Sequence, residues 1–476
     1  MKRIIKRKIP DRYLLSYLSL GVHIVLGFLI YFFEFLSLIY FFTVFIYFIY
    51  KIIRFPLDPK WVLMGCAYIT GAEIFLRMTG GIVFWETGKY MVMLFTALGI
   101  YNQGFKYRSW PYLIFVLLLL PGVIVTYVSM DFYDVSFRKN ILFNISGPLS
   151  LFLSALYCYQ LNIKLQDLFK VFDFLVYPLI SMCIYIVLYT PTNKEIFTAA
   201  ESNAAASGGY SGNQVATIIG LGVFLLFVRF LMPYKKKVFH FLMMGALVLL
   251  TLRGLLTFSR GGMLAGAIMI AFFSAIYYFK VGLKGKAVVT TKLIIIGVGI
   301  FSLWSYTLIR TDGMIYNRYS GRNALGEKEE DITTGRIKIL EEELDAFLDS
   351  PFLGIGVGRT KFFRARETGN YGLPTHNEIT RLLGEHGLLG ILALVILLIT
   401  PVYLNMFGGN KNIFWIPMMI FWGATINHSA MRVAAPGFIY GLALLNIQYP
   451  GIRKKARQRL KTYQRKYHGY KAALSR

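Results

Sequence analysis

The chain contains few cysteines and few acidic residues for its length of 476 residues. Its three cysteines, Cys66, Cys158 and Cys183, are scattered through apolar segments without the spacing of a metal site. We therefore interpret them as buried small apolar side chains, and we predict no metal and no other cofactor. Only 16% of the residues are charged, whereas 56% are hydrophobic, a balance typical of membrane proteins.

Apolar segments of about 20 residues recur along the chain, and this is the length that a bilayer core roughly 30 Å thick requires. We count about fourteen such segments, with twelve as the plausible lower number. The sequence therefore predicts an all-α polytopic membrane protein. The candidate spans start near Tyr13, Phe35, Trp61, Lys89, Trp110, Ile141, Leu168, Gln214, Phe239, Gly262, Lys292, Glu378, Ile413 and Val433.

The spans divide the chain into five parts. We expect a basic cytoplasmic N-terminus at 1–12, transmembrane helices at 13–310, a large extracytoplasmic loop at 311–377, C-terminal transmembrane helices at 378–450 and a basic cytoplasmic tail at 451–476. The first apolar run lacks an obvious cleavage site of small residues. We therefore interpret it as an uncleaved helix and not as a signal peptide.

Basic residues concentrate at the two ends of the chain. The formal net charge is +27, and residues 1–12 hold six Lys or Arg, while residues 451–476 hold ten and no acidic residue. This is the positive-inside pattern of a membrane protein, and it predicts that both termini are cytoplasmic. No folded basic domain is present to read a nucleic acid, so we predict membrane lipids and no nucleic acid as partners.

The loop at 311–377 contains one clear helical pattern. A helix is predicted from just after Thr334 to about Asp349, ended by Pro351. We expect this amphipathic helix to lie on the membrane or on the helical bundle with its acidic face in water. Its apolar stripe consists of Ile337, Leu340, Leu344, Phe347 and Leu348, and the acidic residues Glu341–Glu343 and Asp345 mostly occupy the opposite face.

Three arginines are candidates for binding an anion. Arg260 lies in a turn with Gly261 and Gly262, where a helix N-terminus would favour an anion, although an interfacial arginine can also simply reach toward water. Arg253, seven residues earlier, is expensive in a membrane helix unless it is paired or faces a wet cavity. Arg336 sits in the first turn of the loop helix, against the helix dipole, and is either a ligand-binding cation or a solvated charge.

Histidines near the ends of spans are candidates for proton transfer. His376 stands beside Asn377 just before the span that starts at Glu378, and histidine can accept a proton near neutral pH. A lone histidine is more often structural, and we expect His386 to pack within the bundle. His428 and Arg432, four residues apart, either extend a basic cavity or cap it.

Two further patterns have simpler interpretations. Glu73 and Arg77 are four residues apart in an early span and are expected to form an ion pair within one helix. Gly354-x-Gly356-x-Gly358 follows a helix and a proline. Because a dinucleotide fingerprint follows a strand, we predict a tight loop here.

Taken together, these residues resemble the O-antigen ligase/polymerase family of bacterial membrane glycosyltransferases. The matching motifs are Ser259-Arg260-Gly261-Gly262, Arg336-x-x-x-Leu340, Gly354-x-Gly356-x-Gly358 and His376-Asn377-x9-Gly387-x-x-Gly390. The resemblance covers about residues 210–430. It implies a helical fold of the GT-C type, in which the ligases have about twelve spans.

The resemblance also implies an activity. The donor would be a glycan on undecaprenyl diphosphate, joined to a hydroxyl of a glycan, a lipid core or a protein, with inversion and without a metal. His376 would be the general base, and Arg260 and Arg336 would bind and stabilise the diphosphate leaving group. The expected substrate-binding residues are Arg253, Leu340, Asn377, His428 and Arg432.

The resemblance implies that the protein is located in the bacterial cytoplasmic (inner) membrane, with its active site on the periplasmic or extracellular side. A polymerase of a cell-envelope polysaccharide and a ligase that completes lipopolysaccharide both fit, and we lean to the polymerase. A flippase or transporter of lipid-linked oligosaccharide is the alternative. It would need charged groups along a central path, whereas this chain concentrates them at one face.

Overall fold

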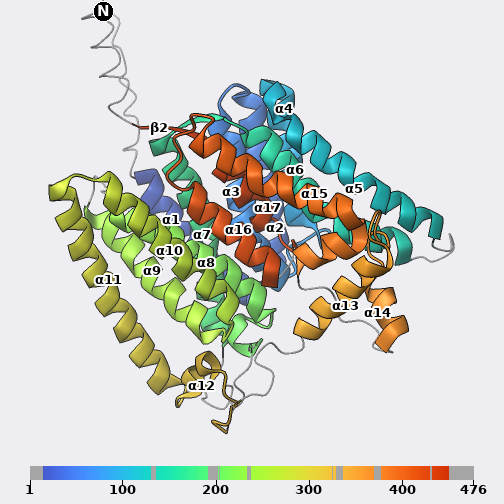
Figure 1. The fold of residues 1–476 in the computed structure, drawn as a ribbon. Helices are drawn as coiled ribbons and strands as arrows, with labels where there is room; N and C mark the ends of the chain where they lie inside the picture. Colours follow the sequence, from blue (N-terminus) through green and yellow to red (C-terminus); the bar gives the residue numbers. More distant parts are fainter. Residues whose placement is uncertain are drawn as a thin grey trace, which may run out of the picture.

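The computed structural model describes residues 14–129, 136–190, 202, 204–232, 237–323, 325–328, 336–368, 377–428 and 431–449. Within these ranges the chain forms seventeen α-helices and one pair of three-residue strands, packed into a helical bundle (Figure 1). Two short 3-10 turns, η1 (Tyr107–Ser109) and η3 (Ala205–Ser207), complete the regular structure. The predicted all-α polytopic membrane fold is confirmed.

Each of the fourteen predicted membrane segments is a helix. Ten of the described helices are long and apolar enough to cross a membrane. The other four, α1, α4, α16 and α17, have 19, 17, 14 and 9 residues. The fourteen are α1 (Leu14–Phe32), α2 (Phe35–Arg54), α3 (Pro59–Met78), α4 (Thr87–Gln103), α5 (Trp110–Ser129), α6 (Ser136–Cys158), α7 (Leu165–Tyr189), α8 (Gly212–Leu231), α9 (Lys237–Leu256), α10 (Arg260–Lys280), α11 (Leu283–Arg310), α15 (Glu378–Met406), α16 (Trp415–His428) and α17 (Ala435–Ala443).

The connectors between spans gather at two opposite ends of the bundle (Figure 1). At one end, β1 (Asn162–Lys164) pairs in parallel with β2 (Asn446–Gln448), so the α6–α7 connector lies beside the segment that follows α17. At the other end lie the α9–α10 turn, the α16–α17 connector and three short helices, α12 (Met314–Ser320), α13 (Arg336–Asp349) and α14 (Thr360–Thr368). We call these the strand end and the loop end.

Helices α3, α7 and α8 form the centre of the bundle. Nearly every residue of α8 is buried, and so is every residue of α3 from Val62 to Arg77. Helix α10 packs closely on α8. The close approach is seen at Gly262, where an added Cβ would lie only 2.3 Å from the carbonyl carbon of Ala216. Gly262 of the arginine motif is therefore a close-packing position between two helices, which explains why a side chain is absent there.

The loop helix α13 has the predicted bounds, but one residue of its acidic face is buried. Ile337 and Leu348 are 55% and 71% exposed, whereas Glu343 is 1% exposed. The Glu343 carboxylate accepts hydrogen bonds from Arg364 of α14 (3.2 Å) and from the Thr380 hydroxyl of α15. The expectation that the whole acidic face lies in water is thus wrong, because these partners satisfy the buried carboxylate.

Helix α15 bends sharply at Gly387, where φ is 61° and ψ is −140°. The bend separates residues 378–386 from the long apolar part that follows. The Leu388 N–H donates to the Pro351 carbonyl (2.7 Å), and a Cβ on Gly390 would lie 2.1 Å from the Leu382 carbonyl oxygen. The two glycines of the Gly387-x-x-Gly390 motif therefore permit a fold-back that other residues would block.

Candidate active site

Arg260 lies in the tight α9–α10 turn at the loop end, which we call the arginine turn. It is the first residue of α10, and Phe258 in the turn has a φ of 57°. The Ser259 hydroxyl donates to the Asn213 side-chain oxygen at 2.8 Å, which fixes the turn on the start of α8. The half-buried Arg260 side chain donates from Nη1 to the carbonyl of Arg318 in α12 (3.1 Å).

Helix α12 contributes two residues that sequence reasoning missed. Arg318 donates from Nε to the Phe258 carbonyl at 3.0 Å, so α12 covers the turn beside Arg260. Among the described residues, the buried Tyr319 hydroxyl has no hydrogen-bond partner. Burial raises the pKa of Tyr319 to about 12, while the Arg260 and Arg318 cations oppose that rise. The glycines at 313 and 321 that bound α12 are the signal that could have revealed this short helix.

His428 lies directly against the arginine turn. A Cβ on Gly261 would be 2.9 Å from Cδ2 of the His428 ring, so Gly261 leaves room for the imidazole. The ring Nε2 is 3.1 Å from the Thr217 hydroxyl, and Nδ1 is 2.7 Å from the Ala424 carbonyl. Both ring nitrogens are thus engaged, and the histidine is held rigidly beside Arg260.

Asn377 brings the start of α15 to the same place. Its side-chain oxygen accepts from the Ile379 N–H (2.9 Å), which makes it the N-cap of the helix. Its side-chain amide donates to the Asn427 oxygen at 2.9 Å, and Asn427 immediately precedes His428. The motifs around Arg260, Asn377 and His428 therefore meet at the loop end, although they lie far apart in the sequence.

Two candidate catalytic residues fall wholly or partly outside this description. His376 lies outside the described residues. Arg336 begins α13, and its side chain is not among those described, whereas Leu340 of the same helix is half-buried.

Arg253 is half-buried in α9 near Cys183 and Arg310, and its Nε has no hydrogen-bond partner within the described ranges. Arg253 thus lies among α7, α9 and α11.

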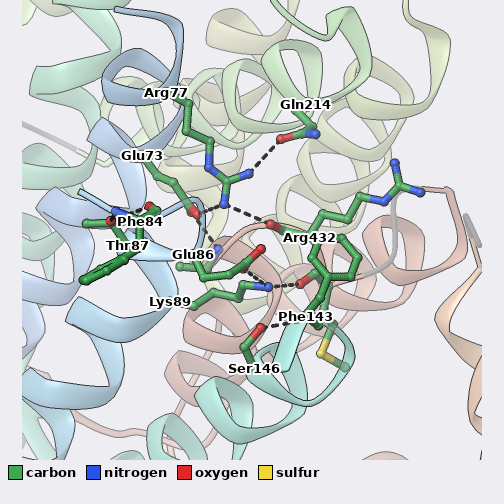
Figure 2. A network of polar contacts seen from close by, with 12 residues as sticks. Glu73, Arg77, Phe84, Glu86, Thr87, Lys89, Phe143, Ser146, Gln214 and Arg432 are labelled. Atoms are coloured by element: carbon green, nitrogen blue, oxygen red, sulfur yellow. Dashed lines mark hydrogen bonds and ion pairs between the residues drawn. The ribbon is translucent and has the colours of Figure 1, made fainter. Parts of the chain in front are cut away.

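Arg432 stands in the connector after α16, so it does not continue the helix that ends at His428. Its carbonyl accepts from Nη2 of Arg77 at 3.1 Å, while its side chain points away from Arg77 (Figure 2). The predicted ion pair between Glu73 and Arg77 is confirmed, with 2.6 Å between Oε1 and Nη2. What the sequence did not reveal is that this pair contacts the Arg432 connector.

The glycine motif forms the predicted tight loop, with positive φ at Gly354, Gly356 and Gly358. The Gly358 N–H donates to the Glu385 carboxylate at 2.8 Å, and this carboxylate also binds Arg381 at 2.5 Å. His386 is buried, as predicted. These contacts fix the loop on α15, so we assign them a structural role.

Arginines and carboxylates pair with one another at several places of the loop end. No group of three or more His, Cys, Asp or Glu that could hold a metal ion occurs among the residues that the structure describes. The half-buried guanidinium group of Arg260, at the N-terminus of α10, suits an anionic ligand such as a phosphate.

Residues 245–395 match the family model described as O-antigen ligase. This match supports the resemblance of the chain to the O-antigen ligase/polymerase family. The match covers about a third of the chain, from within α9 to the long part of α15. No curated protein and no solved structure matches the chain.

The similarity of residues 245–395 to the O-antigen ligase family supports a glycosyltransferase-like activity on lipid-linked glycan and acceptor substrates in general. The matched segment includes the arginine turn and the start of α15. Asn427, His428 and Arg432 lie outside it. Asn427 and His428 nevertheless contact the matched segment, and the Arg432 carbonyl contacts Arg77.

Proposed function

We propose that the protein is an inverting, metal-independent glycosyltransferase that transfers or polymerises undecaprenyl-diphosphate-linked oligosaccharides at the outer face of the bacterial inner membrane. The observation that carries this proposal is the meeting of Arg260, His428 and Asn377 at the loop end. The residue before Asn377 in the chain is His376, the proposed general base. The family match supports the reaction class.

The proposed reaction needs a base and a stabilised leaving group. The acceptor hydroxyl oxygen attacks the anomeric carbon of the donor while its proton passes to the His376 imidazole. The bond from the anomeric carbon to the diphosphate oxygen breaks, and its electron pair leaves with the diphosphate. Arg260 and Arg336 stabilise that developing charge, and attack from the face opposite the leaving group inverts the anomeric centre.

The membrane orientation is part of the proposal. Basic residues are frequent at the strand end, for example Lys51 and Arg54 at the end of α2 and Lys106 and Arg108 before α5. Because cytoplasmic connectors are enriched in Lys and Arg, we assign the strand end, and with it both termini, to the cytoplasm. The loop end then faces the periplasm or the cell exterior, where lipid-linked glycans are presented.

The test is a reconstituted assay with a defined undecaprenyl-diphosphate oligosaccharide. We expect the intact protein to release undecaprenyl diphosphate and lengthen the glycan, and His376→Ala and Arg260→Ala to abolish both. His240→Ala and Arg108→Ala, which remove the same side-chain types at the strand end, should retain activity.

The same assay separates the alternatives. Transfer that requires an added lipid core would identify a ligase, whereas lengthening without it would identify a polymerase. If the lipid changed sides of the membrane and no new glycosidic bond formed, the enzyme proposal would be wrong and a flippase would replace it.

A further inference from the structure

A buried network of charges at the loop end holds the connector that carries Arg432 (Figure 2). Glu73 and Arg77 of α3 form an ion pair of 2.6 Å whose side chains are 1% and 0% exposed. A second pair, Glu86 and Lys89, lies at the start of α4, where Lys89 is fully buried. The two pairs together carry no net charge.

The network contacts three backbone groups within four consecutive residues of the connector. The Lys89 ammonium donates to the Met431 carbonyl at 3.3 Å, and Arg77 Nη2 donates to the Arg432 carbonyl at 3.1 Å. In the opposite sense, the Ala434 N–H donates to Glu73 Oε2 at 2.7 Å. Contacts of both polarities fix the position and the orientation of the chain around Arg432.

The network also reaches the arginine turn. Arg77 Nη1 is 3.4 Å from the side-chain oxygen of Gln214 on α8. The neighbouring residue Asn213 accepts the hydrogen bond of Ser259, directly before Arg260. Arg77 therefore links the connector of Arg432 to α8, and α8 in turn contacts the residue directly before Arg260.

Stability alone is a poor explanation for such a network. Replacing a buried ion pair by apolar side chains of similar volume is often neutral or stabilising, because desolvation of the charges offsets their attraction. Charges inside a membrane protein are expensive and generally accompany function. A geometric role is the better account, because three of the four charged side chains contact the connector directly.

We propose that Glu73, Arg77 and Lys89 are positioning residues that fix the connector of Arg432 at the loop end, so that Arg432 and Arg260 both bind the diphosphate of the donor. This inference rests on the proposed function. The three residues do not touch the substrate themselves. They act through the backbone of the connector and leave the Arg432 side chain directed away from the network (Figure 2).

The decisive variant replaces the first pair by apolar residues, Glu73→Leu with Arg77→Met. Its matched control is Asp173→Leu with Arg229→Met, which removes a buried ion pair of 3.0 Å between α7 and α8. We expect faster hydrogen exchange at residues 431–435 and a KM for the lipid-linked donor raised about tenfold (about 1.4 kcal/mol) in the first variant only. Thermal stability is measured for both.

Arg432→Ala separates positioning from general damage. If the network acts through Arg432, Arg432→Ala raises the donor KM by a similar factor, and adding it to the apolar pair has little further effect. An unchanged KM, an equal rise in the control pair, or full additivity with Arg432→Ala would overturn the proposal.

Two further outcomes are also decisive. If the apolar pair does not fold, Lys89→Met is measured in the same way, because it removes the contact to Met431 and leaves α3 unchanged. If the intact protein transfers no glycan, the proposed function fails. Hydrogen exchange at 431–435 then decides alone whether the network holds the connector.

Discussion

Within the motif His376-Asn377-x9-Gly387-x-x-Gly390, we expect substitution of Gly387 to reduce the stability of the protein most. Its φ of 61° with ψ of −140° belongs to a region that is open essentially to glycine alone. A Cβ there would also lie 2.5 Å from the Pro351 carbonyl oxygen and 2.7 Å from the Phe352 carbonyl carbon, both of them backbone atoms. Gly387→Ala must therefore either move the 351–352 backbone or straighten α15.

The loss of unfolding free energy expected for Gly387→Ala is the sum of these two effects. An unfavourable backbone conformation costs about 1–3 kcal/mol, and overpacking against atoms that cannot move costs about 1–3 kcal/mol more. We expect Gly387→Ala to lower the free energy of unfolding by about 2–6 kcal/mol and to abolish glycan transfer. The loss of transfer follows because the bend places Asn377 near Asn427.

Gly423→Ala in α16 is the matched control. A Cβ at Gly423 would meet nothing within 4 Å, and alanine favours a helix over glycine by up to about 1 kcal/mol. Both variants would be unfolded reversibly in detergent or lipid nanodiscs, with transfer measured in parallel. If Gly387→Ala were as stable and as active as Gly423→Ala, the explanation of the motif as a backbone hinge would be refuted.

Two further predictions concern the contacts that assemble the site. Asn377→Asp keeps the cap oxygen but loses the donor to Asn427, so we expect slower transfer at nearly full stability, whereas Asn377→Ala also loses the cap and about 1 kcal/mol. Wild-type transfer rates in Asn377→Asp would show that the contact is dispensable. Gly262→Ala places a Cβ 2.3 Å from Ala216 and should separate α8 from α10, lowering the melting temperature and activity together. Gly245→Ala in α9, which meets no neighbour, should do neither, and equal melting temperatures for the two would contradict the packing argument.

The span pattern could be predicted from the sequence because bilayer thickness dictates the length of an apolar run. The same local logic gave the bounds of α13, since Pro351 lies just beyond its end. The face that α13 buries could not be predicted in this way. Glu343 turns inward because Arg364 and Thr380 meet it there, and helical periodicity says nothing about such distant partners.

The positions of the candidate site residues could be predicted only in part, for a similar reason. The sequence around Arg260 and Asn377 indicated that each stands at the start of a helix. The contact of Arg77 with the Arg432 carbonyl joins residues that are 355 apart in the chain, and the α12 residues beside Arg260 become neighbours only through folding. The sequence spacing predicted the ion pair of Arg77 with Glu73 but not the contact of Arg77 with the Arg432 carbonyl.

The short, fully buried helix α17 and the strand after it bear on how the protein is made. Nine residues cannot span a bilayer as an independent segment, and α17 is accommodated because protein surrounds its backbone on all sides. Strand β2 then pairs with a strand about 280 residues earlier, as the Asn446–Asn162 hydrogen bond across 284 positions shows. The connector of Arg432 leads directly into α17. Its contacts with Lys89, Arg77 and Glu73 can therefore form only after the segments from α1 to α16 have been synthesised.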